Sequence, residues 1–226
     1  MNDKPNARFG GIVSEGEFFF ELSGGALALD FVNTRDERPA GGIERLVSYL
    51  RLLDFLRQSG ALEAEAFSRL GSLATEQPEE AGNVLASAIS LREAMFTVLQ
   101  SSCAARRPAQ RPLSVLNRWI PSETKFLTGR KGGLSWSSVA PGNTLCSVLR
   151  PLVASLADLL TTDAKRQRVK LCSSATCDWY FLDRSPRANR RWCDMTVCGN
   201  RAKARRHYAR IRSSLGASTG QELAGG

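Results

Sequence analysis

Four cysteines near the C-terminus constrain this chain more than any other feature: Cys172, Cys177, Cys193 and Cys198. They form two close pairs, each with four intervening residues, and fifteen residues separate the pairs. Two such pairs can face each other across a short loop, which is the spacing of a structural zinc site with four thiolate ligands. Because four protein ligands leave no open coordination position, we expect one structural zinc ion and no metal catalysis.

The rest of the chain favours metal ligation over disulfide bonds as the role of these cysteines. No apolar run is long enough to cross a membrane, and the first residues lack the pattern of a signal peptide. We therefore expect a cytoplasmic protein without a membrane partner, in which thiols stay reduced. The remaining cysteines, Cys103 and Cys146, lie singly in apolar stretches, and we expect them to be small core residues.

Positive charge is concentrated around the same four cysteines. The 226-residue chain has a net charge of +9, but residues 164–212 hold 14 Lys and Arg against 3 Asp and Glu, a net +11. Residues 1–163 are close to neutral, with 17 Lys and Arg against 18 Asp and Glu. This asymmetry predicts a polyanionic partner for the C-terminal segment, with a merely solvated basic surface as the alternative.

Hydrophobic periodicity predicts a mostly helical N-terminal domain over residues 1–163. Helical spacing is expected at residues 43–58, 63–75, 81–105, 113–119 and 143–160. Strand patterns are expected at residues 17–22 and in a small hairpin of residues 125–128 and 134–139. Residues 26–34 fit either a strand or the start of a helix, and residues 1–16 and 34–42 are expected to be loops.

A compact zinc-stapled module is predicted over residues 164–212, followed by a disordered tail at residues 213–226. Within the module, the aromatic residues 178–183 favour a strand, and residues 190–192 favour a second strand that returns to Cys193. Two cysteine knuckles, a hairpin and a following helix are the layout of a treble-clef-like zinc finger. The fold class predicted for the chain is therefore α+β.

The helix predicted after Cys198 is apolar on one side and strongly cationic elsewhere. Ala204, Tyr208 and Ile211 share one stripe, which we expect to pack on the hairpin of the finger. Arginine dominates the remaining positions, and its guanidinium group makes bidentate contacts to phosphate and guanine. The candidate nucleic-acid contacts in the finger are Arg184, Arg187, Arg190, Arg191, Arg201, Lys203, Arg205, Arg206 and Arg210.

Short motifs in both halves of the chain resemble known families. Cys198-Gly199-Asn200-Arg201, preceded by Arg191-Trp192-Cys193 and Phe181-Leu182-Asp183-Arg184-Ser185, resembles the CGNR zinc-finger family. Upstream, Leu29-Asp30-Phe31-Val32-Asn33-Thr34, Leu91-Arg92-Glu93 and Ala157-Asp158-Leu159-Leu160 resemble the domain that precedes CGNR fingers, described as a stress-induced transcription regulator. The resemblance implies a bacterial transcription regulator whose finger binds zinc and DNA.

The role of the N-terminal domain stays open between sensing an effector and forming a homodimer. Asn33, Thr34, Arg35 and Arg92 are the candidate polar residues of a pocket for a small-molecule effector. An enzymatic site would have to use these groups together with nearby carboxylates, and ion pairs and helix caps are the alternative for them. The only histidine, His207, lies in the cationic helix, so a Ser-His-Asp device is not expected and we interpret the protein as a non-enzyme.

Two further partners for the finger remain alternatives to DNA. Unpaired RNA bases could stack on Trp179, Tyr180, Phe181 and Trp192, unless these rings pack around the zinc ion instead. The finger could also be a zinc-stabilised adaptor that binds an acidic protein.

Overall fold

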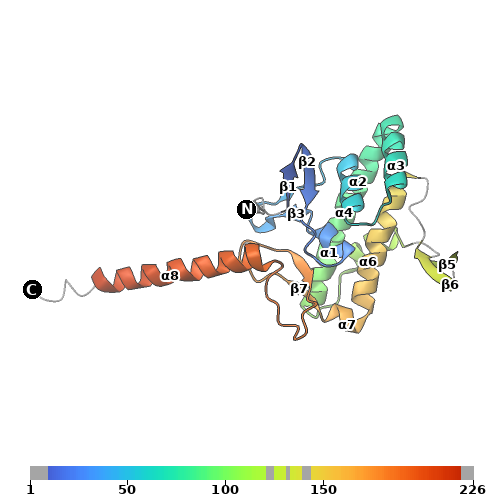
Figure 1. The fold of residues 1–226 in the computed structure, drawn as a ribbon. Helices are drawn as coiled ribbons and strands as arrows, with labels where there is room; N and C mark the ends of the chain where they lie inside the picture. Colours follow the sequence, from blue (N-terminus) through green and yellow to red (C-terminus); the bar gives the residue numbers. More distant parts are fainter. Residues whose placement is uncertain (1–9, 121–124, 131–132, 139–143, 220–226) are drawn as a thin grey trace, which may run out of the picture.

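A computed structural model describes residues 10–120, 125–130, 133–138 and 144–219 of the chain (Figure 1). The strands are β1 (Gly11–Ser14), β2 (Glu17–Phe20), β3 (Arg35–Asp36), β4 (Ile43–Glu44), β5 (Lys125–Arg130), β6 (Gly133–Ser138), β7 (Val169–Leu171) and β8 (Tyr180–Leu182). The α-helices are α1 (Leu27–Val32), α2 (Tyr49–Gln58), α3 (Ala64–Glu76), α4 (Pro78–Cys103), α5 (Gln110–Asn117), α6 (Arg150–Thr161), α7 (Asp163–Arg166) and α8 (Asn200–Thr219). Among these described helices, none combines the length and the apolar character needed to cross a membrane.

Helices α1 to α6 form the body of the molecule around the long helix α4 (Figure 1). Helix α4 begins with Pro78, and proline is tolerated at the first position of a helix. Its first turn also carries Glu79 and Glu80, whose negative charges interact favourably with the positive end of the helix dipole. Its buried side chains include Leu91, Met95 and Leu99, one helical turn apart, and they join the rings and leucines of α1, α2 and α6 in one core. The mostly helical architecture predicted for this half is confirmed.

The strands pair only as four antiparallel two-stranded sheets within the described residues. The predicted hairpin is confirmed as the antiparallel pair of β5 and β6; residue 139 of the predicted second strand lies outside the described residues. Strand β2 confirms the prediction at residues 17–22, but its partner β1 lies in a segment that was expected to be loose. Residues 26–34 adopt the helical alternative, since α1 buries Leu29 and Phe31 in the core.

Two predicted helices begin later than expected. Residues 43–44 pair with β3 instead of forming a helical turn, and α2 starts only at Tyr49, after the Ser48 side chain accepts a hydrogen bond from the Arg51 N–H. Residues 145–149 form a short 3₁₀ helix before α6, whose first turn contains a proline. In both cases a local capping or proline signal fixes the helix start more strongly than apolar spacing does.

The hairpin of the C-terminal module differs from the prediction. Strand β8 pairs with β7, which precedes the first cysteine, whereas residues 190–192 form no strand. Helix α8 runs to Thr219, so residues 213–219 of the predicted disordered tail are helical; residues 220–226 lie outside the described residues. The prediction that Cys103 is a core residue is wrong, because Cys103 is exposed. Cys146 is half-buried and packs against the core of the body.

Strand β8 joins the C-terminal module to the helical body. Tyr180 lies in the body's core with its ring 5.5 Å from that of Phe96, while Phe181 faces the cysteines. The Asn33 side chain matches the backbone of Tyr180: its amide donates to the carbonyl at 2.9 Å and its carbonyl accepts from the N–H at 3.0 Å. One amide therefore satisfies both backbone groups of a buried strand residue.

We expect Asn33→Ala to lower the free energy of unfolding by about 2–4 kcal/mol, because it leaves the Tyr180 N–H and carbonyl unpaired in a buried place. Urea unfolding followed by circular dichroism measures the change. Asn117→Ala, at an exposed position of α5, is the matched control and should shift stability by less than about 0.5 kcal/mol. Equal stability of the two variants would contradict the bridging role of Asn33.

Candidate metal centre and nucleic-acid surface

The four cysteines predicted as zinc ligands form one buried cluster. Their sulfur atoms all lie within 4.8 Å of one another, with 3.7 Å between the Sγ atoms of Cys177 and Cys193 and 3.6 Å between those of Cys193 and Cys198. A tetrahedral zinc ion with Zn–S bonds of about 2.3 Å separates its sulfur ligands by about 3.8 Å, whereas a disulfide needs about 2.05 Å. The cluster thus fits a four-thiolate metal ion and contains no disulfide.

The backbone around each pair presents the sulfur atoms to the common centre. In the first pair, the N–H of Cys172 donates to the carbonyl of Trp179 at 2.9 Å, and that of Cys177 to the carbonyl of Ser174 at 3.0 Å. In the second pair, the Asp194 carboxylate caps a π-helical turn, Met195–Gly199, by accepting from the Val197 N–H at 2.8 Å. This turn leads directly into α8, so the second pair fixes where that helix begins.

The protonation of the thiols shows why a cation suits this cluster. The hydrogen bond with Cys177 is the largest cause that lowers the pKa of Cys172, whereas the hydrogen bond with Cys172 is the largest cause that raises the pKa of Cys177 and of Cys193. One thiolate therefore opposes ionisation of the next within a buried site. A divalent cation removes this repulsion and allows all four sulfur atoms to ionise, which couples metal binding to proton release.

A buried carboxylate organises the loop between the two cysteine pairs. Asp183 accepts hydrogen bonds from the Lys170 ammonium group at 2.7 Å, the Ser185 hydroxyl at 2.6 Å and the Arg190 N–H at 2.9 Å. Although burial alone would raise the pKa of Asp183, these donors hold it below its ordinary value. Residues 183–190 are thus folded around one anion, which explains why the expected return strand is absent.

Several predicted nucleic-acid contacts are engaged within the protein. The Arg190 guanidinium donates to the carbonyls of Trp192 and Cys193 and stacks on the Phe181 ring, 4.8 Å from its centroid. Arg184 donates to the carbonyl of Gly25 at 2.5 Å, and Arg201 to the Thr176 hydroxyl at 3.3 Å. These arginines hold the finger together and to the body, a role that the sequence pattern did not indicate.

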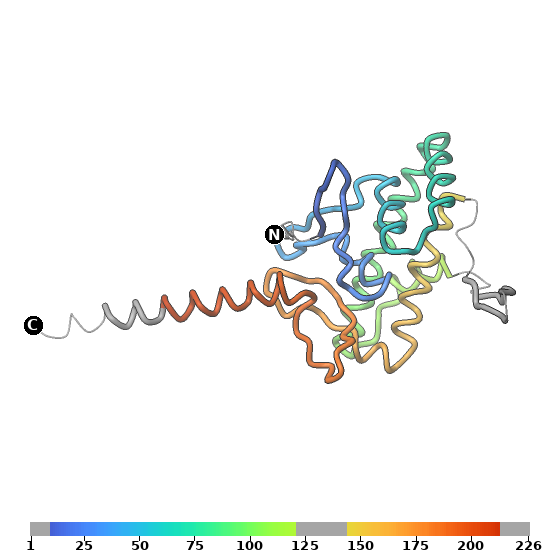
Figure 2. Tube along the Cα trace, viewed as in Figure 1, coloured from blue at the N-terminus to red at the C-terminus, as the bar shows by residue number. Residues whose placement is uncertain are grey.

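The other predicted cations are solvent-exposed, and most lie on α8. They are Arg187, Arg191, Lys203, Arg205, Arg206 and Arg210, to which the structure adds Arg212. Helix α8 projects from the body instead of packing on it (Figures 1 and 2). The expected packing of its apolar stripe is wrong, because Tyr208 is 65% exposed and Ile211 41% exposed.

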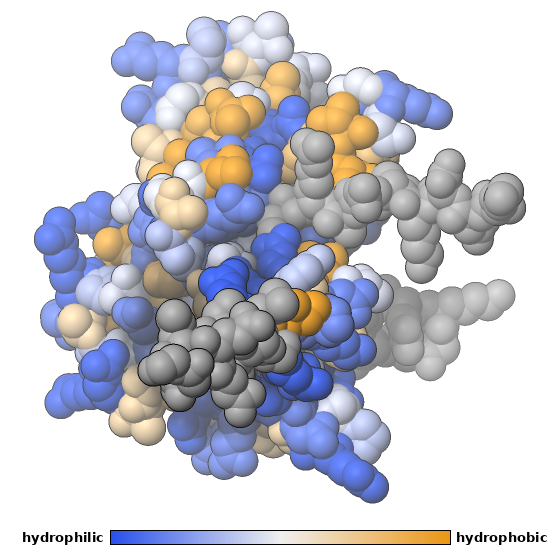
Figure 3. Space-filling view, turned by 90° about the vertical axis from the view of Figure 1, so that its left-hand side faces the viewer, coloured by the Kyte–Doolittle hydropathy of each residue, from blue (hydrophilic) through white to orange (hydrophobic). Residues whose placement is uncertain are grey.

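The face of the molecule from which α8 projects has a hydrophilic half and a more hydrophobic half. Figure 3 shows mostly hydrophilic residues over the lower half of this face, whereas hydrophobic residues gather in its upper half. Exposed apolar side chains of the body include Val13, Phe19 and Val47. A polyanion that approached α8 would therefore meet a polar surface below it.

The aromatic residues of the finger pack inside the protein. Trp179, Tyr180 and Phe181 are each at most 2% exposed, and Trp192 is half-buried beneath the Arg191 guanidinium, 5.4 Å from its ring centroid. The alternative of packing around the cysteine cluster is thus confirmed for Trp179 and Phe181, whereas Tyr180 packs in the core of the body. Stacking of RNA bases on these three rings would require the finger to unfold.

The four candidate effector residues lie at the seam between the body and the finger. Asn33, Thr34 and Arg92 are buried, and Arg35 is partly exposed with its guanidinium 3.8 Å from the Glu93 carboxylate. Arg92 binds Glu44 through two hydrogen bonds of 2.6 Å and also contacts the Thr34 hydroxyl. The ion-pair alternative is therefore confirmed for Arg35 and Arg92, whereas Asn33 and Thr34 form hydrogen bonds instead. An effector pocket among the four residues stays a prediction.

The same seam contains a chain of ion pairs that reaches the first cysteine pair. Arg38 lies 2.5 Å from Glu93 of α4 and 3.4 Å from Asp178, the residue after Cys177. Its guanidinium also stacks on Phe96, 4.1 Å from the ring centroid. Burial raises the pKa of Asp178, and the charge of Arg38 partly offsets this effect. The body thus places a cation beside the metal cluster.

Comparison with known families covers both halves of the chain. Residues 168–211 match the family model described as CGNR zinc finger, and residues 25–163 match that described as Putative stress-induced transcription regulator. The families and their order agree with the resemblance of the sequence motifs. Neither description is that of an enzyme. No curated protein sequence matches the chain.

We expect the purified protein to contain one zinc ion per chain, and Cys193→Ser to lose it, because three sulfur ligands hold zinc far more weakly than four. Elemental analysis by mass spectrometry, with protein quantified in parallel, measures the stoichiometry. Cys103→Ser and Cys146→Ser, which alter cysteines outside the cluster, are matched controls and should keep the ion. Full zinc content in Cys193→Ser would exclude this residue as a ligand.

Proposed function

The chain belongs to the family described as putative stress-induced transcription regulators, and from this premise we propose that it regulates transcription by binding duplex DNA through its zinc finger and helix α8. The observation that carries the proposal is the exposure of α8. Between residues 200 and 212 the helix has six Lys and Arg residues and no carboxylate, and its side chains from Lys203 to Arg212 are exposed. A cationic helix held away from its own protein is suited to a polyanion.

The distribution of cations around α8 supports binding in the major groove. At 100° per residue, Lys203, Arg206 and Arg210 fall on one side of the helix, and Arg205 and Arg212 on the other. A helix in the major groove has a phosphate strand on each side, so cations on both sides can reach both strands. The 20 residues of α8 span about 30 Å, which is long enough to cross the groove.

Duplex DNA fits the structure better than single-stranded RNA does. Proteins that bind unpaired bases present exposed aromatic rings as stacking platforms. In this finger Trp179, Tyr180 and Phe181 are buried, so the electrostatic surface of α8 remains as the main means of recognition. The adaptor alternative would require an acidic protein surface in place of the phosphate backbone.

In this proposal the metal ion is structural. We assign one zinc ion to the four cysteines, where it supplies the cross-link that holds the turn from which α8 starts. Lys170 binds Asp183 of the intervening loop, and Arg190 of the same loop donates to the carbonyl of Cys193. Because β8 also enters the core of the body, the direction of α8 depends on the body as well as on the metal. We assign effector sensing or dimerisation to the body, which would act on DNA through this connection.

We expect Arg205→Ala with Arg206→Ala to weaken binding to duplex DNA about tenfold at moderate salt, because two phosphate contacts are lost. The slope of log K against log salt should become shallower by about 1.8 for the same reason. Fluorescence anisotropy with a labelled random duplex, titrated over a salt series, measures both quantities. Zinc content should not change, since neither side chain contacts the cysteine cluster.

The matched control is Arg69→Ala with Arg111→Ala, which removes the same charge from exposed positions on α3 and α5. This control should keep the affinity and the salt slope. An equal loss in both double variants would reduce the effect to net charge and overturn the assignment of α8. Binding to single-stranded RNA in preference to the duplex would move the function to RNA, and the absence of binding to either at low salt would favour the protein adaptor.

A further inference from the structure

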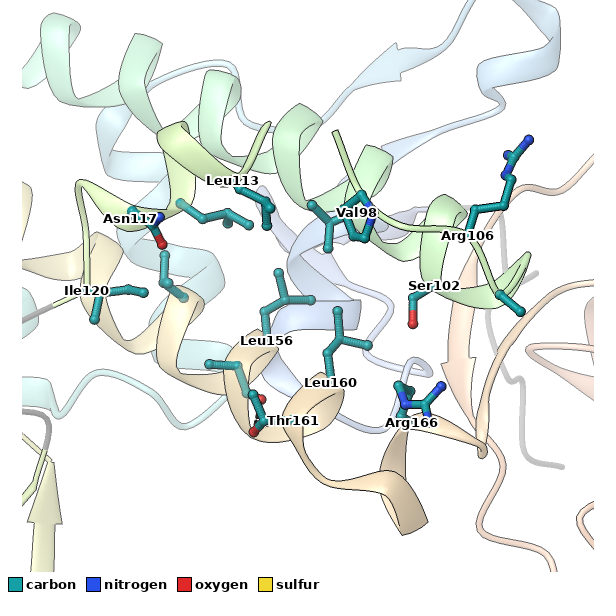
Figure 4. A pocket seen from close by; sticks show the side chains of 15 residues that line it. Val98, Ser102, Arg106, Leu113, Asn117, Ile120, Leu156, Leu160, Thr161 and Arg166 are labelled. Atoms are coloured by element: carbon teal, nitrogen blue, oxygen red, sulfur yellow. Dashed lines mark hydrogen bonds between the residues drawn. The ribbon is translucent and has the colours of Figure 1, made fainter. Parts of the chain in front are cut away.

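A cavity lies in the body between the end of α4, α5 and α6, away from the cysteines and the ion pairs of the seam. Its volume is about 490 Å³, which is in the range of small-molecule sites. Figure 4 shows Leu113 of α5 on one side of it, facing Leu156 and Leu160 of α6 on the other. None of the residues predicted as effector contacts lines this cavity.

The walls of the cavity are mainly apolar, and part of its lining belongs to the core of the body. Val98 of α4 and Val153 and Leu156 of α6 line it, and each is less than 5% exposed. An apolar ligand would also cover more exposed lining residues, such as Ile120, which is 48% exposed, and would remove their apolar surface from water at about 25 cal/mol per Å². The shape therefore suits a compact apolar molecule of about a dozen non-hydrogen atoms.

One end of the cavity is cationic. Arg166 of α7 and the Ser102 hydroxyl stand at this end, whereas the side chain of Arg106, just after α4, points away from it (Figure 4). The lining includes these two arginines and no carboxylate. Arg166 has one guanidinium nitrogen on Asp163 at 2.8 Å, in an exposed ion pair that is weak in water. A guanidinium group has five donors, so this contact leaves it able to bind a second anion.

We propose that this cavity is a binding site for a small amphipathic carboxylate, with its hydrocarbon part between α4, α5 and α6 and its carboxylate at Arg166 and the Ser102 hydroxyl. The ligand class follows from the two ends of the site: buried valine and leucine at one, and at the other an arginine whose acidic partner, Asp163, is exposed and outside the lining. The inference rests on the proposed function only in giving the ligand a regulatory meaning, since the binding itself needs no DNA.

The cavity lies next to a helix that is connected to the finger, so a bound ligand could change the position of the finger. Helix α6 runs from the cavity wall into α7 and then into β7, which pairs with β8. On its other side α6 holds α1, where the Ser155 hydroxyl accepts a hydrogen bond from the Ala28 N–H at 3.0 Å. Helix α1 in turn leads to Asn33, which binds Tyr180. Helix α6, which the ligand would contact, is thus connected to β8 by two routes. One runs through α7 and β7, and the other through α1 and Asn33.

The test is direct binding of decanoate to the zinc-loaded full-length protein by isothermal titration calorimetry in the absence of DNA. We expect one molecule per chain with a dissociation constant below about 1 mM, and tenfold or weaker binding of decanol, which has the same chain without the carboxylate. Arg166→Gln should weaken decanoate binding about three- to tenfold and leave decanol unchanged. Arg107→Gln, an exposed neighbour outside the lining, is the control and should bind like the wild type.

Blocking variants locate the ligand. Ala157→Trp and Ser102→Phe each add bulk at a lining position, and each should abolish binding while the unfolding midpoint shows that the protein is folded. Ala64→Trp, at an exposed position on α3, should not affect binding. The proposal would be overturned if the wild type did not bind decanoate at 1 mM or bound decanol as tightly as decanoate. It would also be overturned if both blocking variants bound decanoate as tightly as the wild type. DNA affinity is measured separately, so its loss leaves this result unchanged, and a failure here leaves the DNA-binding proposal intact.

Discussion

The three-residue strand β8 has to satisfy two cores at once, and the rest of the structure depends on it. Successive side chains of a strand point to opposite faces, so Tyr180 enters the core of the helical body while Trp179 and Phe181 pack around the cysteines. The backbone of Tyr180 is bound by Asn33 on α1, and that of Leu182 by the Gly24 carbonyl at 2.8 Å. The metal cluster is therefore built on an edge of the body rather than tethered to it, and the direction of α8 is set by both.

Charge is used differently in the two halves of the finger. Near the cysteines, cations are matched to anions or carbonyls: Lys170 to Asp183, Arg38 to Asp178, and Arg190 to two backbone carbonyls. Burying such groups unpaired would be costly, so these contacts hold the loops in one arrangement. Along α8 the cations have solvent around them and no acidic neighbour in the helix. The mutual repulsion of these cations lowers the stability of the folded protein, and a bound polyanion would neutralise it.

Features that depend on residues close together in the chain can be predicted from the sequence, whereas contacts between distant residues cannot. The cysteine spacing was sufficient for the cluster, because a metal ion imposes a local geometry that few sequences can meet. Apolar spacing located the helices of the body, although Ser48 and a proline moved two of their starts. The pairing of β7 with β8 was missed, since the sequence near Trp192 offered an equally short alternative strand. The sequence pattern indicates Asn33 and Arg92 as candidate polar residues of an effector pocket, but it does not predict that both side chains are buried.

The sequence by itself determined the metal-binding cluster, the helical character of the body and the separation of charge between the two halves, because each is written in spacing or composition over a short stretch. Only the tertiary structure decided which arginines are structural and which face solvent, which side of the aromatic strand enters which core, and that α5 and α6 leave a cavity beside α4. These features depend on residues far apart in the chain. Arg184 and Gly25, or Asn33 and Tyr180, meet only after the body and the finger have folded against each other, and no local pattern specifies such a meeting.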